Sequence, residues 1–415
     1  MFRKSNHPRG AKHTALLAVL LLSGIGMAPV HGADIWLSNA RLLDVTGMSD
    51  VRDINVHISG GRILEITAAG PKSGAIDLKR AFLLPGFIDA HAHIEDPASA
   101  ERALLSGVTT ARLLGDVNLK GLATRDLIKQ GNTPGPELLA SAGHVRPELG
   151  ESFVLSFPQF GRYLHTPLKG EDNVREVVRA VIARGADVIK VGASERAGLA
   201  RTDPRKPELS YGEIRAAVLE ADKRGLFVAA HSHGANGVNA AVRAGVRSIE
   251  HGTYVDDETL ALMKKQGTYF VPTLAIMSPL GDPTGNDAES IALQLRTHHM
   301  MKPLRDAVRK AQVLGIVIAG GTDGSYGDGD DSARVRPGSE VEALVASGLT
   351  PMQAITAATL NSARVLGIES RTGSIAAGLE ADLLVVARDP REDTSTLFEP
   401  MLIINNGELV LNRLY

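Results

Sequence analysis

Side chains that bind metal ions or move protons recur at the ends of short apolar runs in this sequence. The first run, FLLPGFIDA, ends in His91-Ala-His93, and alternate residues of a strand share a face. Later runs carry the other members of the set, which are Lys190 in DVIKVGA, His231 and His233 in VAAHSHG, His251 in SIEHGTY and Asp323 in IAGGTDGS. Imidazole and carboxylate groups bind divalent ions, and such ions turn water into a nucleophile near neutral pH. The set therefore predicts a metal centre.

Each motif alone also has a purely structural explanation. The H-x-H histidines can be solvated loop residues, His251 can be a hydrogen-bonded buried histidine, and Asp323 can cap a helix. Lys190 is the most informative member, because a lone ammonium group is costly to bury in an apolar strand unless its side chain reaches the surface. A modified or metal-linked nitrogen removes that cost. Because these residues follow successive predicted strands, their joint occurrence favours a functional site.

Strand and helix patterns alternate through the middle of the chain. Besides the FLLPGFIDA run, strands are expected at 108–114, 137–142, 188–191, 227–230, 248–250, 269–273 and 316–319. Helical patterns intervene at 173–184, 211–223, 238–244, 257–266 and 288–313. Eight strand–helix units predict an α/β fold with a (β/α)8 TIM barrel over residues 83–369, whose strand ends converge on one mouth. An open doubly wound sheet is the alternative, although no G-x-G-x-x-G follows the first strand.

Both ends of the chain outside this region have strand-like patterns. Residues 34–82 alternate apolar and polar positions, with a hairpin signal at Gly60-Gly61, and residues 370–415 do the same around Asn406-Gly407. Chain termini are often close together in space. We therefore expect the two segments to form one small composite β-sandwich domain.

The N-terminus has the pattern of an export signal. Basic residues precede an apolar run at about 15–28, and small residues follow before Asp34. Since the run is shorter than the ~20 residues of a spanning helix, residues 1–33 are expected to be a cleaved signal peptide of a periplasmic or secreted protein, with no membrane contact afterwards. The formal net charge of -2 gives no reason to expect a nucleic-acid partner. The sequence has no cysteine, so metal ligands must be His, Asp, Glu or a modified side chain.

Several motifs together resemble the amidohydrolase superfamily over about residues 35–415. LLPGFIDAHAH is similar to its strand-one signature, and IEHGT, GGTDG and GLTPMQAITAATLNSARVLG are similar to later blocks. GSIAAGLEADLLVV is similar to the C-terminal return into the small β-module. The most similar branch is the imidazolonepropionase-like group, which includes Xaa-Pro dipeptidases and enzymes that cleave N-acyl amino acids, ochratoxin among them.

The resemblance implies a binuclear metal centre. His91 and His93 would match the strand-one pair on the more buried metal, and His231 and His251 the ligands of the second metal. Lys190 would match a lysine that carbon dioxide carboxylates, so that it bridges both ions. Zinc is the default metal, while the sequence leaves manganese, cobalt and iron open.

The same resemblance implies roles for the remaining candidates. Asp323 would be both a ligand and the group that moves the proton in catalysis. His233 shares a strand face with His231, so either can ligate; we expect His231 to ligate and His233 to face the substrate. His144, in ASAGHVR, is a further expected substrate contact, with an ordinary loop position as the alternative, and Tyr254 is a candidate to bind the carbonyl oxygen.

The resemblance therefore implies hydrolysis of an amide bond by a metal-bridging hydroxide. The expected small-molecule substrates are dipeptides such as Xaa-Pro or N-acyl amino acids, including ochratoxin-like amides. A cyclic amide or imidazolone is the alternative substrate class. A secreted binding protein without activity is the non-enzymatic alternative, against which the complete ligand set argues. The resemblance also implies a homo-oligomer.

Overall fold

The computed structural model describes residues 34–48, 51–70, 72–116, 118–278, 287–327 and 335–415. The predicted signal segment at 1–33 lies outside the described residues, so its cleavage and the export of the protein remain predictions. Within the described part of the chain, no helix combines the length and apolar character needed to cross a membrane.

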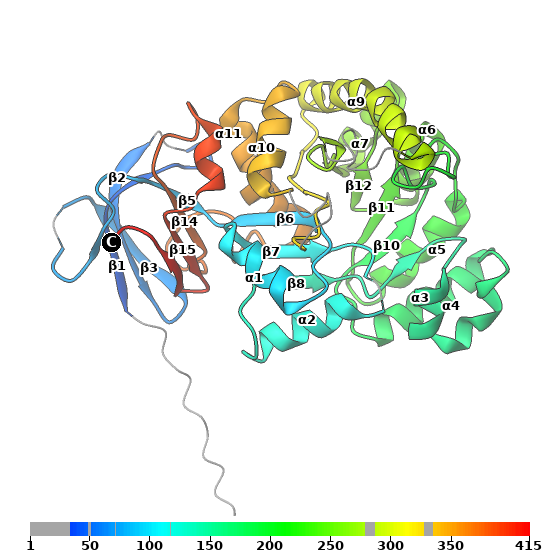
Figure 1. The fold of residues 1–415 in the computed structure, drawn as a ribbon, viewed down its shortest axis with the longest axis horizontal. Coiled ribbons are helices and arrows are strands. Elements are labelled where there is room, and N and C mark those ends of the chain that lie inside the picture. Colours follow the sequence, from blue (N-terminus) through cyan, green and yellow to red (C-terminus); the bar gives the residue numbers. More distant parts are fainter. Residues whose placement is uncertain (1–33, 49–50, 71, 117, 279–286, 328–334) are drawn as a thin grey trace, which may run out of the picture. The chain divides into compact units, whose positions relative to one another are not determined.

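Short parallel strands in the middle of the chain form two sheets, as Figure 1 shows. Their orders are β6-β7-β8 and β13-β12-β11-β10-β9. The strands are β6 (Phe87–Ala92), β7 (Val108–Leu113), β8 (Glu137–Ala140), β9 (His144–Val145), β10 (Ile189–Gly192), β11 (Val228–Ser232), β12 (Ser248–His251) and β13 (Tyr269–Val271). The amide of Asp187 donates to the carbonyl oxygen of Ala140 at 2.8 Å, which links the end of β8 to the segment before β10. The seven expected strands from β6 to β13 are therefore present, with β9 added.

The expected eighth strand, 316–319, is present only as isolated bridges. Phe270 on β13 donates to Val317 at 3.0 Å and accepts from Ala319 at 2.9 Å. On the other side, Ala90 of β6 donates to Gly320 at 2.9 Å. Glycines are poor strand formers, so Gly320-Gly321 shortens the ladder while the segment still joins β13 to β6. The parallel strands are thereby closed into a ring.

Helices follow most of the barrel strands. They are α1 (Pro97–Leu105), α2 (Lys120–Lys129), α3 (Glu151–Ser156), α4 (Glu171–Ala183), α5 (Tyr211–Asp222), α6 (Ala235–Ala244), α7 (Asp257–Gln266), α9 (Ala288–Leu314), α10 (Pro337–Ala346), α11 (Pro351–Thr356) and α12 (Ser362–Leu366). Shorter helical turns are 158–164, 357–361 and 394–398. Local sequence explains their faces and ends. In α4, four valines spaced at 174, 177, 178 and 181 are buried, and Ser210 forms a capping box with Glu213 at the start of α5.

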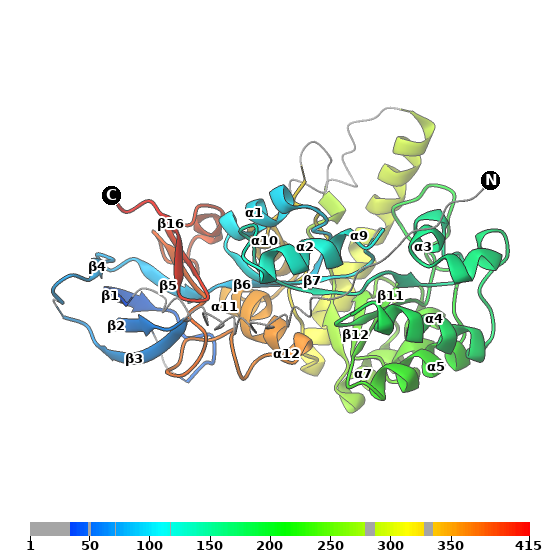
Figure 2. The ribbon, with the colours of Figure 1, turned by 90° about the horizontal axis from the view of Figure 1, so that it is seen from below.

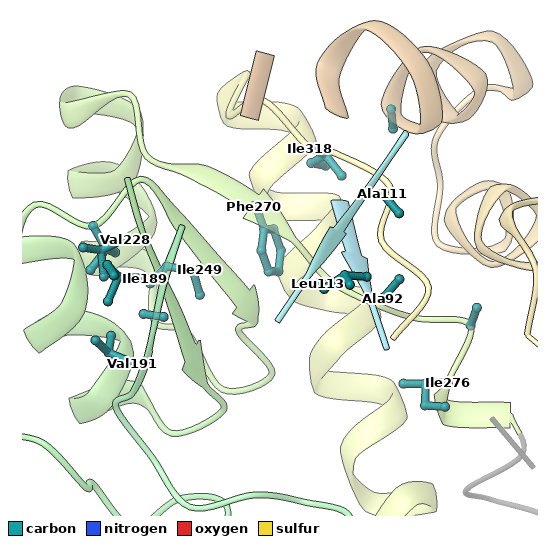
Figure 3. Packing of buried hydrophobic residues seen from close by; sticks show 14 of the residues in the cluster. Ala92, Ala111, Leu113, Ile189, Val191, Val228, Ile249, Phe270, Ile276 and Ile318 are labelled. Carbon is teal, nitrogen blue, oxygen red and sulfur yellow. The ribbon is translucent and has the colours of Figure 1, made fainter. Parts of the chain in front are cut away.

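The barrel strands are buried on both faces, which explains their continuous apolar runs. Figure 3 shows Ile189, Val228 and Ile249 from three neighbouring strands lying together. Phe270 lies between this group and the side chains of Ala92 and Leu113. Packing of this core fixes the positions of the strand ends, where the candidate ligands lie.

The two ends of the chain pair into one sheet, which lies beside β6 and β7 in Figure 2. Its order is β16-β15-β14-β5-β1-β2-β3, and β4 pairs with β1. The strands are β1 (Ile35–Leu42), β2 (Arg52–Ser59), β3 (Arg62–Ala68), β4 (Ile76–Asp77), β5 (Phe82–Pro85), β14 (Leu383–Val386), β15 (Leu402–Asn405) and β16 (Glu408–Asn412). Apolar residues from both halves form one buried cluster. The composite module therefore exists as a single hydrogen-bonded path, while its folding into a sandwich stays a prediction. Because β5 pairs with β1 and β14, it straddles the expected boundary at 82/83.

Both predicted hairpin turns are present, and they meet. Gly60 and Gly61 have φ of 56° and 79°, and Asn406 and Gly407 have φ of 49° and 78°. These left-handed values match the tight turns that such dipeptides favour. A Cβ atom on Gly407 would lie 2.5 Å from the Cα of Gly61, so the contact between the two turns requires glycine.

Asp382, in the EADLLVV motif, makes the stability of this sheet depend on pH. Burial raises the pKa of its carboxyl group to about 6, although Asn406 N–H (2.8 Å) and Thr372 Oγ1 (2.7 Å) both donate to it. Because the folded state then holds the proton more tightly, stability is lost as pH rises from the unfolded value of 3.8 to about 6. We compare the free energy of unfolding of the wild type with that of Asp382→Asn. The difference, wild type minus variant, should decrease by roughly 2–3 kcal/mol as pH rises through that window.

Denaturant unfolding at a series of pH values measures this difference. Asp77→Asn, at an exposed aspartate of the same sheet, is the matched control and should show no such loss. A wild-type-minus-Asp382→Asn difference that stays constant from pH 4 to pH 6.5 would contradict the expectation.

Candidate metal centre

The candidate residues converge on one cavity at the carboxyl ends of the barrel strands. Its volume is about 520 Å³, within the usual range for small-molecule sites. Its lining includes His91, His93, His144, Lys190, His231, His233, His251 and Asp323. Tyr254 does not line it; its amide donates to the carbonyl oxygen of His233 at 2.8 Å. The structure therefore brings together every sequence-predicted site residue except Tyr254, whose substrate role stays a prediction.

Two overlapping groups of ligand atoms lie at the bottom of this cavity. One comprises His231, His233 and His251, with one atom from each within 4.8 Å of the others. The second, with the same limit, comprises His91, His251 and Asp323. His93 joins the second group through Nε2, which lies 2.8 Å from Asp323 Oδ1. Since His251 belongs to both groups, the two groups of ligand atoms are neighbours in the cavity.

Hydrogen bonds orient three of the histidine rings. His91 Nδ1 lies 2.9 Å from the Glu250 carboxylate, which only accepts when ionised, so Nδ1 carries the proton and Nε2 is left for a metal ion. Hydroxyl groups occupy the Nδ1 side of the other two rings, where Thr273 lies 2.7 Å from His251 and Thr253 lies 2.9 Å from His233. Each ring is thus held with its Nε2 side available.

Burial favours the neutral form of four of the site histidines; in His93, the hydrogen bond to Asp323 outweighs burial and raises the pKa. Burial lowers the pKa of His91 to about 4 and that of His233 to about 3, and it holds the pKa values of His231 and His251 well below their usual range. Burial raises the pKa of Asp323, but His91, His93 and Lys190 outweigh it and bring the value to about 2. Unprotonated imidazoles beside an ionised carboxylate are the state that a cation requires.

Lys190 and His231 each have a buried side-chain nitrogen without a hydrogen-bond partner among the described residues. These atoms are Nζ of Lys190, which is 2% exposed, and Nε2 of His231. Burial lowers the pKa of Lys190 to about 8, against the opposing effect of Glu250 and Asp323. Such unpaired buried polar atoms are costly unless a further group completes them. The two unpaired nitrogens fit a metal centre in which the Lys190 side chain is modified.

Backbone strain and close packing occur at the same place. His251 and Asp323 have φ of 71° and 55°, a left-handed conformation that is unfavourable for residues with a side chain and is often retained at functional sites. A Cβ atom on Gly321 would lie 2.6 Å from Val271 Cγ1 and 2.9 Å from His91 Cβ. Only glycine lets the segment before Asp323 pass so near His91.

Comparison with known proteins decides the family. Residues 82–410 match the model of the Amidohydrolase family. This chain belongs to the amidohydrolase family. It is 31% identical to an ochratoxinase of Aspergillus niger over an alignment of 361 residues, and the match covers 77% of this chain and 73% of that protein. It is 24% identical to an imidazolonepropionase of Symbiobacterium thermophilum over 356 residues, covering 77% and 78% of the two chains.

Solved structures agree with this assignment. A Xaa-Pro dipeptidase crystallised with methionine in its active site superposes with a TM-score of 0.80 at 29% identity, covering 91% of this chain and 99% of that one. These relatives confirm a TIM-barrel type α/β fold and identify the amidohydrolase as a hydrolase of carbon–nitrogen bonds.

Sequence reasoning missed the residues that support the ligands of this amidohydrolase. Arg112, 2% exposed, bonds Glu250 through Nη2 at 2.9 Å and Ala90 O through Nε at 2.6 Å. Burial raises the pKa of Glu250, but Arg112 and His91 outweigh this and bring it to about 2. Asp89 accepts hydrogen bonds from Thr322 and Tyr326 and so ties β6 to the segment that carries Asp323. A charged residue inside an apolar run was the available signal, as it was for Lys190.

Replacing Glu250 with glutamine should destabilise the amidohydrolase, because Arg112 loses its buried counter-charge. We expect the free energy of unfolding to fall by about 3 kcal/mol. Because the partner of His91 Nδ1 is also altered, metal affinity should fall roughly 10- to 100-fold. Denaturant unfolding with a chelator present, and metal titration, measure the two effects separately.

Thr273→Val is the matched control, since it removes an uncharged partner of His251. Its cost should be only about 1 kcal/mol. Equal stability of Glu250→Gln and Thr273→Val would mean that the buried ion pair does not support the ligands as described.

Proposed function

We propose that this amidohydrolase cleaves an amide bond in a small substrate with the aid of two divalent metal ions. The observation that carries the proposal is the pair of ligand groups that share His251 inside a cavity of about 520 Å³. Dipeptides such as Xaa-Pro and N-acyl amino acids are the proposed substrates, in keeping with the dipeptidase and ochratoxinase among the similar proteins.

Two neighbouring metal sites are proposed. His91, His93 and Asp323 would hold one ion, and His231 and His251 the other. His231 is preferred over His233 because its buried Nε2 has no partner among the described residues. Lys190, carboxylated by carbon dioxide on its buried Nζ, would offer the oxygens of an anionic carbamate to both ions. Zinc is the proposed metal for this nitrogen and oxygen donor set.

When bound, the ions supply Lewis acidity and lower the pKa of a water molecule near the scissile carbonyl. The protein residues perform the remaining steps. Asp323, ionised at neutral pH, accepts the proton of the attacking water and returns it to the leaving nitrogen, so that water and amide give a carboxylic acid and an amine. His144 or His233 would hold the developing oxyanion; both line the cavity, and the buried Nε2 of His144 lacks a partner among the described residues.

A substrate panel tests this function on the purified protein loaded with zinc. The panel comprises Xaa-Pro and other dipeptides, N-acyl amino acids, an ochratoxin-like amide, a lactam and an imidazolone, with chelated protein as the control. Metal-dependent turnover of a dipeptide or N-acyl amino acid supports the proposal. Turnover of the cyclic amides alone would replace the substrate class, an outcome that the similarity to an imidazolonepropionase makes the second candidate. No turnover after metal loading would overturn the proposal.

We also propose that the protein acts in the periplasm or outside the cell and forms a homo-oligomer. The first proposal rests on the signal pattern of residues 1–33, and the second on the family resemblance. Cell fractionation with N-terminal sequencing tests the location and cleavage. Sedimentation tests the assembly.

A further inference from the structure

A second group of unpaired polar atoms lies in the same cavity, beside the proposed metal centre. Arg146 is 5% exposed and bonds Glu208 through Nη2. Its Nε and Nη1, together with Glu208 Oε2 and His144 Nε2, are buried and have no hydrogen-bond partner among the described residues. A guanidinium with two uncommitted donors in a water-excluded place is arranged to bind an acceptor.

Gly192 shows how closely these groups approach one another. It ends β10, two residues after Lys190, and β10 pairs Lys190 with His144. A Cβ atom on Gly192 would lie 2.4 Å from Glu208 Oε2, 3.0 Å from Arg146 Cβ and 3.3 Å from His144 Nε2. The absence of a side chain at this position leaves these groups next to one another, at the end of the strand that carries Lys190.

The charge on this side of the cavity is predominantly positive. Arg146, Arg196 and Arg201 line it together with Glu148, and Glu208 pairs with Arg146. Arg196 lines the cavity and is exposed, and its guanidinium makes no hydrogen bond or ion pair with the described residues, whereas its backbone carbonyl accepts from Thr202 Oγ1 at 2.5 Å. Although the residue as a whole is exposed, partial desolvation of its guanidinium lowers the pKa of Arg196, and the charge of Arg146 lowers it further. An anion between the two arginines would relieve this repulsion.

The rim is held in place from α9. Arg296 donates to four backbone carbonyls of the loop after β10, those of Ala197 (2.8 Å), Leu199 (2.6 Å), Ala200 (3.0 Å) and Thr202 (2.5 Å). A guanidinium presents its donors in a rigid fork, so these bonds fix the course of the loop. Arg196 is therefore kept at the mouth of the cavity, on the side of Arg146.

We infer that Arg146, with Arg196 at the rim, binds a carboxylate of the substrate, so that the enzyme selects amides that carry a free carboxylate near the scissile bond. This inference rests on the proposed amide hydrolysis and deepens it. The carboxylate accepts from the uncommitted N–H groups of Arg146 and from the Arg196 guanidinium, while Glu208 holds Arg146 in place. Neutral amides lack this contact, and their binding leaves the Arg146 donors unpaired.

Matched substrates test the selection. We expect L-alanyl-L-proline and N-acetyl-L-phenylalanine to be hydrolysed with kcat/KM at least about tenfold above their carboxamides, mainly through KM, because the contact exists already in the ground state. Arg196→Met and the double variant Arg146→Met/Glu208→Gln should bring this ratio to within about twofold while metal content is retained. The double variant removes both charges together and so avoids a buried unpaired glutamate.

Arg205→Met is the control, because Arg205 belongs to the same loop but points to solvent and pairs with Asp203. Its acid-to-amide ratio should equal that of the wild type. Calorimetric binding of 3-phenylpropionate and 3-phenylpropionamide to the zinc-loaded protein gives the same comparison without turnover. One outcome separates the two proposals: no amide is hydrolysed, yet 3-phenylpropionate binds more tightly than 3-phenylpropionamide and this preference is lost in the variants. The carboxylate site would then be supported, and the proposed function would be wrong. No preference in the wild type, or a preference unchanged in both variants, overturns the carboxylate site.

Discussion

Asp323→Asn is expected to lower kcat by on the order of 10³-fold while leaving the metal content close to that of the wild type. The asparagine side chain can still offer an oxygen to a metal ion, but it cannot accept the proton of water. In the wild type, Asp323 Oδ1 lies 2.8 Å from His93 Nε2 and 3.3 Å from His91 Nε2, and its pKa of about 2 keeps it ionised. The loss should appear equally in kcat and kcat/KM, because the interaction is made in the transition state.

Asp116→Asn provides a matched control for this variant. Asp116 lines the same cavity, but its carboxylate accepts from the amides of Gly121 (2.8 Å) and Leu122 (3.2 Å) at the start of α2. We expect turnover near that of the wild type. Steady-state kinetics and metal analysis of both variants test whether Asp323 moves the proton. Near-normal turnover in Asp323→Asn would rule out that role.

Lys190→Ala is expected to abolish detectable turnover and to reduce bound metal from about two ions per chain to about one or fewer. The buried Nζ has no partner among the described residues, and the proposed carboxylation gives it one. In that reaction the amine attacks carbon dioxide, a nitrogen–carbon bond forms, one proton is released, and an anionic carbamate results. The alanine variant lacks the amine and therefore the bridging ligand. Without that negative charge between them, the two metal ions repel each other.

Two further measurements separate a bridging lysine from a merely structural one. Propionate added to Lys190→Ala should restore part of the activity, since a short carboxylate can enter the space of the missing side chain. Metal-free wild type should regain activity faster with bicarbonate present than without it. Lys302→Ala, at an exposed lysine on α9, should behave as the wild type in both assays. Full activity of Lys190→Ala with two bound metal ions would contradict the bridging role.

Local patterns in the sequence predicted much of the fold. The hairpins at Gly60-Gly61 and Asn406-Gly407 follow from dipeptides that tolerate positive φ, and the barrel strands follow from apolar runs that end in polar residues. The eighth strand was predicted at full length, whereas the structure has only bridges there. Its ladder depends on how Gly320 and Gly321 pack against β6, and that contact joins residues far apart in the chain.

Only some of the residues that line the cavity were predicted. Again, contacts between distant parts of the chain decide the positions of the others. Residues at the carboxyl ends of strands, such as His91 in β6 and His251 in β12, are placed by the strand register, so their meeting could be predicted. Tyr254 lies three residues beyond His251, where the loop path decides its position, and it falls outside the cavity lining. Arg146 and Glu208 belong to different loops, and only the folded chain shows that they pair.

The contacts of Glu250, Arg112 and Asp89 were not predicted, because a charged residue in an apolar run indicates burial but does not indicate its partner. Glu250 precedes His251 in SIEHGTY, and nothing local indicates that its carboxylate bonds both Arg112 and the ring of His91. These partners are 138 and 159 residues away. Such contacts depend on which strands lie opposite each other in the barrel.

Activity as a function of added zinc tests the central claim most directly. Protein stripped by a chelator is titrated with zinc in bicarbonate buffer, and hydrolysis of the best substrate of the panel is followed at each step. We predict no turnover without zinc and a plateau at about two equivalents per chain. Full turnover by the metal-free protein, or a plateau at one equivalent, would contradict a two-metal amidohydrolase site at the ends of these strands.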